Sequence, residues 1–268
     1  MTTLKTSTLQ RENSFTFKIV FMKAKKLIST LALVTVILFS ACKNDEPTVN
    51  TDNPNGIPNQ TVTMPIVVMS GASDFALLAG SAITSTGATN ITGNMGLSPG
   101  TSIGGFPPGI LTGTQQINTN LATQGKLDLT AAYNDAAGRT STDIVTLSGN
   151  IGGLTLTPGL YKTTSSLAIS SGDLTFDAKG NADAVFIIQI ASSLTTTSGR
   201  QVFLKNKASA SNIFWQVGSS VTFGTTSVFK GTVMAMQSIT FNTGATLQGR
   251  AMARIGGIVL AGNIIVKE

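Results

Sequence analysis

The sequence predicts an all-β solenoid, a discontinuous right-handed β-helix with one long α-helix packed along one face. Three observations predict this fold. A strand pattern repeats at a short period near the C-terminus, a copy of that pattern stands far earlier in the chain, and one stretch has helical periodicity. A unit this short cannot bury its own apolar face, so units of this kind stack and share one core.

The repeat occupies the C-terminal part of the chain. Its strands read SVTF at 220–223, SITF at 238–241 and GIVL at 257–260. Val221, Ile239 and Ile258 therefore follow one another at nearly equal steps. A fixed period of about 20 residues is typical of a solenoid in which each turn adds one strand to each face.

Within each repeat strand, apolar and polar residues alternate with period two. Val221 and Phe223 are expected to point inward, and Thr222 outward. Neighbouring strands lie about 4.8 Å apart, and alternate residues along a strand about 6.7 Å apart. The outward hydroxyl groups are therefore expected to form a flat, regular grid.

A copy of the repeat lies near the start of the predicted domain. Residues 81–84 read SAIT, and the corner TGAT at 86–89 matches the corner TGAT at 243–246. We expect this early unit to stack beside the late ones, which would make the solenoid discontinuous in sequence.

Residues 115–138 have the helical pattern. Small and apolar residues follow steps of three and four along one face, at Leu121, Gly125, Leu129, Ala132 and Ala136. Gly138 is a natural stop. The helix, with its Tyr133, is interpreted as structural, covering one face of the solenoid.

Other segments complete the expected fold. Residues 73–79 read as either a short helix or a strand, and 98–113 as a surface loop rich in Gly and Pro. The run at 185–190 is apolar throughout, which predicts a strand buried on both faces beneath the helix. Residues 201–204 precede the Val221 strand by a step of the same length as those of the repeat, and they are expected to extend its stack. Trp215 is interpreted as a core residue.

Composition argues against catalysis and against nucleic acid binding. Charged residues make up 11% of the chain, Asp and Glu total 12, and His is absent. General acids, general bases and metal ligands are therefore few. The net charge of +6 arises mostly in residues 1–42, and the remainder has a net charge of only +1. The charge of the remainder therefore does not indicate a basic surface that would bind nucleic acid.

Residues 1–65 are expected to lie outside the folded domain. Residues 1–21 are interpreted as an upstream extension or a misassigned start, and 22–42 as an export signal. The signal ends in SAC at 40–42, which resembles a lipoprotein box with lipidation at Cys42, although Phe39 stands where Leu is usual. An ordinary signal peptide is the alternative. Residues 43–65 are expected to be a disordered tether. The protein would be exported, and either secreted or lipid-anchored at the cell surface.

Three motifs carry a family resemblance over residue 66 to the C-terminus. They are DLTAAYNDAAGR at 128–139, LTPGLY at 156–161 and NIFWQV at 212–217. Together they resemble the DUF3494-type ice-binding (antifreeze) proteins of bacteria and fungi. The resemblance implies a discontinuous right-handed β-helix of triangular section, with a helix along one face and another, flat face that binds ice. It implies no enzyme activity and no cofactor or metal.

Some members of that family have a T-A/G-X-T/N motif on the ice face. The matching segments here are 81–84, 219–222, 237–240 and 256–259; the first comes near the motif and the fourth ends in Val259. The expected ice-binding residues are Thr84, Thr222 and Thr240, with Ala82, Ser220 and Ser238 beside them and the corner residues Thr86, Thr243 and Thr246 ranked lower. The expected partner is an ice surface, bound by a monomer, with Cys42 as an outer-membrane lipid anchor.

Two other functions stay open. A β-helix enzyme acting on polysaccharide would need clustered carboxylates. Asp173, Asp177 and Asp183 are close together in sequence, although solvated turn charges explain them more simply. A cell-surface adhesin or polysaccharide-binding protein could use the same flat face.

Overall fold

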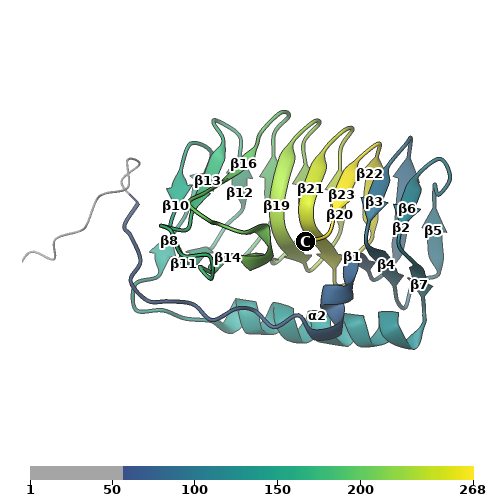
Figure 1. The fold of residues 1–268 in the computed structure, drawn as a ribbon, viewed down its shortest axis with the longest axis horizontal. Coiled ribbons are helices and arrows are strands. Elements are labelled where there is room, and N and C mark those ends of the chain that lie inside the picture. The colour runs from purple at the N-terminus through teal and green to yellow at the C-terminus, as the bar shows by residue number, and fades with distance from the viewer. Residues whose placement is uncertain (1–56) are drawn as a thin grey trace, which may run out of the picture. The chain divides into compact units, whose positions relative to one another are not determined.

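The computed structural model describes residues 57–268, and the expected export signal and Cys42 lie outside the described residues. These residues form a solenoid of parallel strands with the helix α2 (Asn120–Gly138) lying along it (Figure 1). Residues 57–268 belong to one compact unit. No helix within residues 57–268 is long and apolar enough to cross a membrane.

Within residues 57–268 the strands form sheets of eight, three and twelve strands. The eight-stranded sheet has the order β5 (Ser102–Gly104), β2 (Ala82–Thr86), β22 (Ile258–Ala261), β20 (Ile239–Phe241), β18 (Val221–Phe223), β15 (Leu194–Thr196), β12 (Leu167–Ile169), β9 (Gly149–Asn150). The three-stranded sheet is β10 (Thr155–Leu156), β13 (Leu174–Asp177) and β16 (Val202–Lys205).

The twelve-stranded sheet bends around a corner and so contributes to two faces. Its strands are β1 (Phe75–Ala79), β3 (Asn90–Thr92), β4 (Asn94–Leu97), β6 (Ile110–Thr112), β7 (Gln115–Ile117), β8 (Val145–Thr146), β11 (Gly159–Thr163), β14 (Phe186–Ile190), β17 (Ile213–Val217), β19 (Val228–Ala235), β21 (Thr246–Ala253) and β23 (Ile264–Val266). The bend lies at Gly231 and Gly249, which pair in register and have φ of 108° and 140°. A Cβ atom at Gly249 would collide with the carbonyl oxygen of Gly231.

The solenoid therefore has three faces. The helix face has the second halves of β19 and β21 at its centre. On the β19 side, β17 is followed by β14, β11 and β8. On the β21 side, β1 is followed by β4 and β7. The third face comprises the first halves of β19 and β21, and β21 continues the face by pairing with β23, which is followed by β3 and β6. At the other end, a single β-bridge between Val228 of β19 and Gln201 connects this face to the three-stranded sheet. The eight-stranded sheet is the remaining face.

The predicted discontinuity is confirmed. Strand β2 pairs with β22, which places Thr84 opposite Val259, and β23 pairs with β3. Residues near the start of the domain therefore lie beside its last strands.

The segment 98–113 was expected to be a surface loop, and this prediction is wrong. It contains β5 and β6, which add a further coil beyond β2 and β3. At 73–79 both expected alternatives occur in part, because the 3-10 helix η1 (Ser70–Asp74) runs directly into strand β1.

The expected position of residues 201–204 is also wrong. Strand β16 lies in the three-stranded sheet, whereas Val221 pairs with Leu194 on one side and Ile239 on the other. Coil length explains the error. The coil that contains β16 also holds the short helix η2 (Ala210–Asn212), so Leu194 and Val221 lie farther apart in the sequence than Val221 and Ile239 do.

Helix α2 begins later than expected. The prediction was 115–138, but residues 115–117 form β7 and the helix starts after Thr119, whose hydroxyl accepts a hydrogen bond from the backbone N–H of Ala122. Leu121 is 60% exposed, so it was wrongly assigned to the buried face, which starts at Ala122. Tyr133 is buried, and its hydroxyl donates to the carbonyl of Val217, which confirms its structural role.

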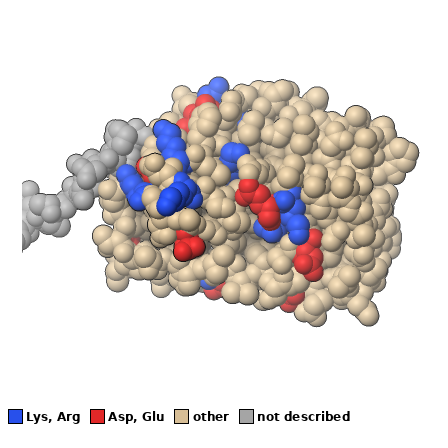
Figure 2. Space-filling model, viewed as in Figure 1, with Lys and Arg blue, Asp and Glu red and all other residues tan. Residues whose placement is uncertain are grey.

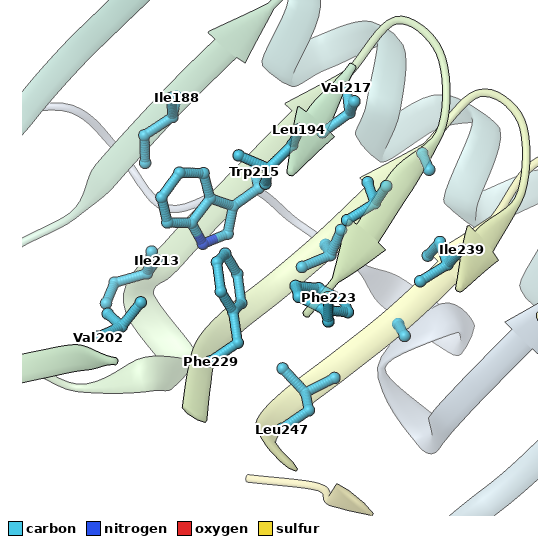
Figure 3. Packing of buried hydrophobic residues seen from close by; sticks show 14 of the residues in the cluster. Ile188, Leu194, Val202, Ile213, Trp215, Val217, Phe223, Phe229, Ile239 and Leu247 are labelled. Carbon is cyan, nitrogen blue, oxygen red and sulfur yellow. The ribbon is translucent and has the colours of Figure 1, made fainter. Parts of the chain in front are cut away.

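The interior contains a run of aromatic rings that pack edge-on or tilted against one another. Trp215 is fully buried, and its ring centroid lies 5.6 Å from that of Phe176. On the other side it lies 5.0 Å from the ring centroid of Phe229 (Figure 3). The run continues through Phe223 to Phe241 at 4.7 and 4.5 Å. Strand β14 is buried on both sides as predicted, because Ile188 faces this core and Ile187 faces the helix. The core therefore holds the coils rigidly in register.

The expected disordered tether over 43–65 is wrong for residues 57–65. Ile57 joins the core, and Gln60 Oε1 accepts a hydrogen bond from the backbone N–H of Leu160. The carboxylate of Asp143 accepts hydrogen bonds from the backbone N–H groups of Thr61 and Val62 at 2.6 and 2.9 Å. These contacts join residues that are far apart in the chain, so the local sequence of the polar segment 57–65 gives no sign of them.

The pKa of Asp143 reflects this contact. Desolvation acts to raise the pKa, but hydrogen bonds from the Ser141 hydroxyl and from Val62 and Thr61 outweigh it and lower the pKa to about 2. Because the folded pKa lies below the ordinary value of 3.8, the contact stabilises the fold above about pH 4 and loses its effect as the pH falls toward 2.

Asp143→Asn should therefore lower the free energy of unfolding by about 1 kcal/mol at neutral pH, since a carboxylate accepts these hydrogen bonds more strongly than an amide and is partly solvated. The check is the melting temperature measured at several pH values from about 7 down to about 2. The variant should lose part of the acid dependence of the wild type. Asp183→Asn, at an exposed turn, is the matched control. Equal acid slopes in wild type and Asp143→Asn would contradict the prediction.

Candidate functional site

The outer side of the eight-stranded sheet, called here the hydroxyl face, carries most of the expected site residues. Burial alternates along its strands, so that Thr222 is half-buried between the buried Val221 and Phe223. The same alternation holds for Thr240 in β20 and Thr84 in β2. The inward residues belong to the rigid core, which holds the outward side chains in position.

The pairing registers define a threonine row across this face. In spatial order it reads Gly104, Thr84, Val259, Thr240, Thr222, Thr195, Ala168, Asn150. Among residues 57–268, no protein group hydrogen-bonds to the four threonine hydroxyls of this row, those of Thr84, Thr195, Thr222 and Thr240. These hydroxyls are therefore available to water.

A serine row runs beside the threonine row, one alternate position earlier in each strand. It reads Ser102, Ala82, Gly257, Ser238, Ser220, Ser193, Ser166, Ser148. The hydroxyls of Ser166 and Ser193 hydrogen-bond to each other at 2.8 Å. The two rows together form the grid that the alternation predicts.

Seven of the nine predicted ice-binding residues share this face. They are Ala82, Thr84, Thr86, Ser220, Thr222, Ser238 and Thr240. Thr246 does not belong there, because the chain turns after β20 and Thr246 lies in β21 on the third face, between Val228 and Ile264. Thr243 is exposed in the turn itself. Of the three corner residues, only Thr86 therefore lies on the hydroxyl face.

Ser102 and Ser148 escaped the sequence reasoning, and so did three residues in the middle of the face: Ser166, Ser193 and Thr195. These three belong to β12 and β15 or immediately precede them, and these strands pair with each other and with β18. A signal for them exists, because Leu167, Leu194 and Val221 follow one another at two equal steps. These steps are longer than those of the C-terminal repeat, so a single short period does not reveal them.

The hydroxyl face is free of charge. None of its eight strands contains Asp, Glu, Lys or Arg, so nothing on the strands titrates. Charges gather on other surfaces, as Figure 2 shows near the C-terminus. Lys230 lies there before the bend in β19, and Arg250 lies just after the bend in β21 and donates a hydrogen bond to the backbone carbonyl of Glu268. A surface of this kind favours an uncharged partner.

Two of the three carboxylates considered for catalysis are engaged in hydrogen bonds at turns, and the third, Asp183, is exposed. Asp177 accepts hydrogen bonds from the Lys179 backbone N–H and the Asn206 side chain, both at 2.8 Å. Asp173 Oδ1 lies 3.6 Å from Arg200 Nη1 and accepts from the backbone of Gln201. Within residues 57–268 no three His, Cys, Asp or Glu side chains are grouped to hold a metal ion.

Residues 77–266 match the family model described as Ice-binding-like. The chain belongs to this family. Among Ice-binding-like relatives, an ice-binding protein of Nostoc sp. (strain HG1) is 41% identical over 200 residues, covering 74% of this chain and 73% of the relative. An ice-binding protein of Flavobacterium frigoris (strain PS1) is 33% identical over 270 residues, covering 87% of this chain and 95% of the relative.

Solved structures of Ice-binding-like proteins have the same fold. An ice-binding protein from an Antarctic biological consortium superposes with a TM-score of 0.78 at 65% identity, covering 78% of this chain and 95% of that chain. An ice-binding protein from an Arctic yeast superposes with a TM-score of 0.71 at 32% identity, covering 76% of this chain and 94% of that chain. The Ice-binding-like solenoid predicted from the sequence is thus confirmed.

Proposed function

We propose that the protein binds ice through the hydroxyl face, and that it acts as an antifreeze protein and not as an enzyme. The observation that carries the proposal is the uncharged grid of serine and threonine rows on a rigid sheet. Membership of the Ice-binding-like family supports it, as do the ice-binding relatives.

The mechanism follows from the regular spacing of the rows. Neighbouring rungs lie about 4.8 Å apart, and the two rows about 6.7 Å apart. The threonine hydroxyls bind water, and the methyl groups between them shed their hydration when the ordered water layer joins the crystal. Each buried methyl group contributes only about 0.8 kcal/mol. Many such groups act together, and the entropy of ordering them was already lost on folding.

Two measurements test the proposal. A chain of residues 43–268 should show thermal hysteresis and should inhibit ice recrystallisation at micromolar concentration. A protein that does neither would not be an ice-binding protein. An adhesin or polysaccharide-binding protein would use the same face but would leave ice growth unchanged, so the same measurements separate the alternatives.

Thr195 provides a test at a position that the structure added. Thr195→Tyr should lower thermal hysteresis, because a tyrosine ring would stand above the threonine row beside Thr222. The melting temperature should change by no more than about 2 °C, since Thr195 is exposed. Thr92→Tyr, at an exposed position on the third face, is the control and should keep full activity. Equal activity of the two variants would exclude β15 from the ice-binding face.

We further propose that the protein acts as a monomer and is exported, with Cys42 carrying a lipid anchor. The export pattern at 22–42 supports the proposal. Mass spectrometry of the protein from its native host would show either a diacylglyceryl-modified Cys42 or a free thiol, and a free thiol would exclude the anchor.

A further inference from the structure

Three lysines gather at one corner of the solenoid, where two turns stack. The turn after β13 and the turn after β16 are joined by hydrogen bonds from Ala178 N to Lys205 O at 3.2 Å and from Gly180 N to Asn206 O at 3.1 Å. Lys179, Lys205 and Lys207 are all exposed there. We call these three residues the lysine corner; Figure 2 shows blue side chains gathered at this end of the molecule.

The backbone of these turns would suit glycine or asparagine better than lysine. Lys179 and Lys207 have φ of 51° and 71°, in the left-handed region that side chains with a Cβ avoid. Residues held in such a conformation need compensation elsewhere, and they often mark a functional surface. The turns thus carry positive charge at positions where a neutral, flexible residue would fit with less strain.

The nearby carboxylates offset this charge only in part. Asp177 is buried beneath the turn, where burial raises its pKa but hydrogen bonds from Asn206 and Lys179 outweigh this and lower it. Its carboxylate lies 3.7 Å from the Lys179 ammonium. Among residues 57–268, Lys205 and Lys207 form no ion pair. Asp183 is the one other charged residue of these turns, and it too is exposed, so the corner is net positive.

The lysine corner lies opposite the hydroxyl face. In each of these coils the chain passes from the hydroxyl face (β12, β15) to the three-stranded sheet (β13, β16), through the turn with the lysines, and on to the helix face (β14, β17). The turns therefore occupy the edge between the other two faces, which is the edge farthest from the hydroxyl face in a three-sided section.

The corner also lies beside the start of the described chain. Lys179, Ala178 and Asn181 line a hollow of about 370 Å³ together with residues 59–63. The described chain therefore begins close to this corner, and the expected export segment precedes it in the sequence.

We propose that the lysine corner binds the anionic headgroups of a phospholipid membrane and holds the hydroxyl face turned away from it. Lysines are attracted to an anionic surface, and the attraction is confined to about a Debye length. Charge complementarity and the entry point of the chain both favour a membrane as the partner. The proposal does not require Cys42 to be lipidated, and it is independent of ice binding.

The test uses residues 43–268, which keep the whole compact unit, and vesicles of phosphatidylcholine with or without phosphatidylglycerol. In low salt, co-sedimentation should occur with the anionic vesicles only and should weaken as salt is added. Lys205→Gln with Lys207→Gln should reduce binding about tenfold. Lys230→Gln with Lys267→Gln removes the same charge from elsewhere on the domain and should have little effect.

Equal losses in the two double variants, or equal binding of the wild type to neutral and anionic vesicles, would overturn the proposal. Ice recrystallisation measured with and without anionic vesicles tests the orientation. Inhibition should persist when the protein is bound to vesicles, and its loss on binding would show that the hydroxyl face is turned toward the membrane. Because sedimentation involves no ice, a failure of this proposal is distinct from a failure of the ice-binding proposal.

Discussion

Changing both Thr222 and Thr240 to Tyr should remove most of the thermal hysteresis while shifting the melting temperature by no more than about 2 °C. The two threonines are neighbours in the middle of the threonine row and point away from the core. A rigid face binds a flat lattice only if no side chain stands above it. Two adjacent tyrosine rings would hold the face off the ice, and the contacts on either side would be lost with them.

Thr246→Tyr is the matched control for this experiment. It makes the same substitution at a strand position of similar burial, but on the third face. Thermal hysteresis, ice crystal shape and melting by circular dichroism should be measured for all three proteins. If Thr246→Tyr removes activity and the double variant keeps it, the third face binds ice and the hydroxyl face does not.

Ile239→Asp should prevent folding. Ile239 is fully buried and lies between Val221 and Ile258 in the pairing register, one residue before Thr240. The substitution removes a large apolar side chain, at about 2–5 kcal/mol, and adds the cost of burying an unpaired carboxyl group. Together these approach the total stability of an ordinary domain, about 5–15 kcal/mol.

Thr240→Asp is the control for this second prediction, because it places the same side chain one residue further along the strand and on the outer side. That variant should fold, with a melting temperature close to that of the wild type, and should lose ice activity. Circular dichroism and analytical gel filtration would distinguish the two outcomes. A soluble, cooperatively melting Ile239→Asp protein would show that β20 does not pack against the core as described.

The stacked strands were predictable because their signal is local. Alternation places Val221 and Phe223 inside and Thr222 outside in any parallel sheet with one buried side. A constant step between similar strands implies stacked coils, which is why the neighbours β18, β20 and β22 were assigned to one face. The copy at 81–84 was found in the same way.

The positions of other residues depend on coil length. Ser193 and Thr195 were missed because the coil that contains them is longer than the later ones, since a short helix and wide turns lie between its strands. Thr246 was placed near the ice face because its corner motif repeats that of 86–89. The bend of the chain puts it on another side. Such bends depend on glycine conformations and on packing, and the repeat period of the sequence does not predict either of them.

The sequence by itself determined the kind of fold, the alternation that exposes Thr84, Thr222 and Thr240, and the scarcity of charge that argues against catalysis. These are properties of neighbouring residues and of their regular spacing. Only the tertiary structure decided the order of the rungs, with Val259 between Thr84 and Thr240. It also decided which turns stack to form the lysine corner. Both depend on pairing between residues far apart in the chain, where the order is set by how the whole core closes.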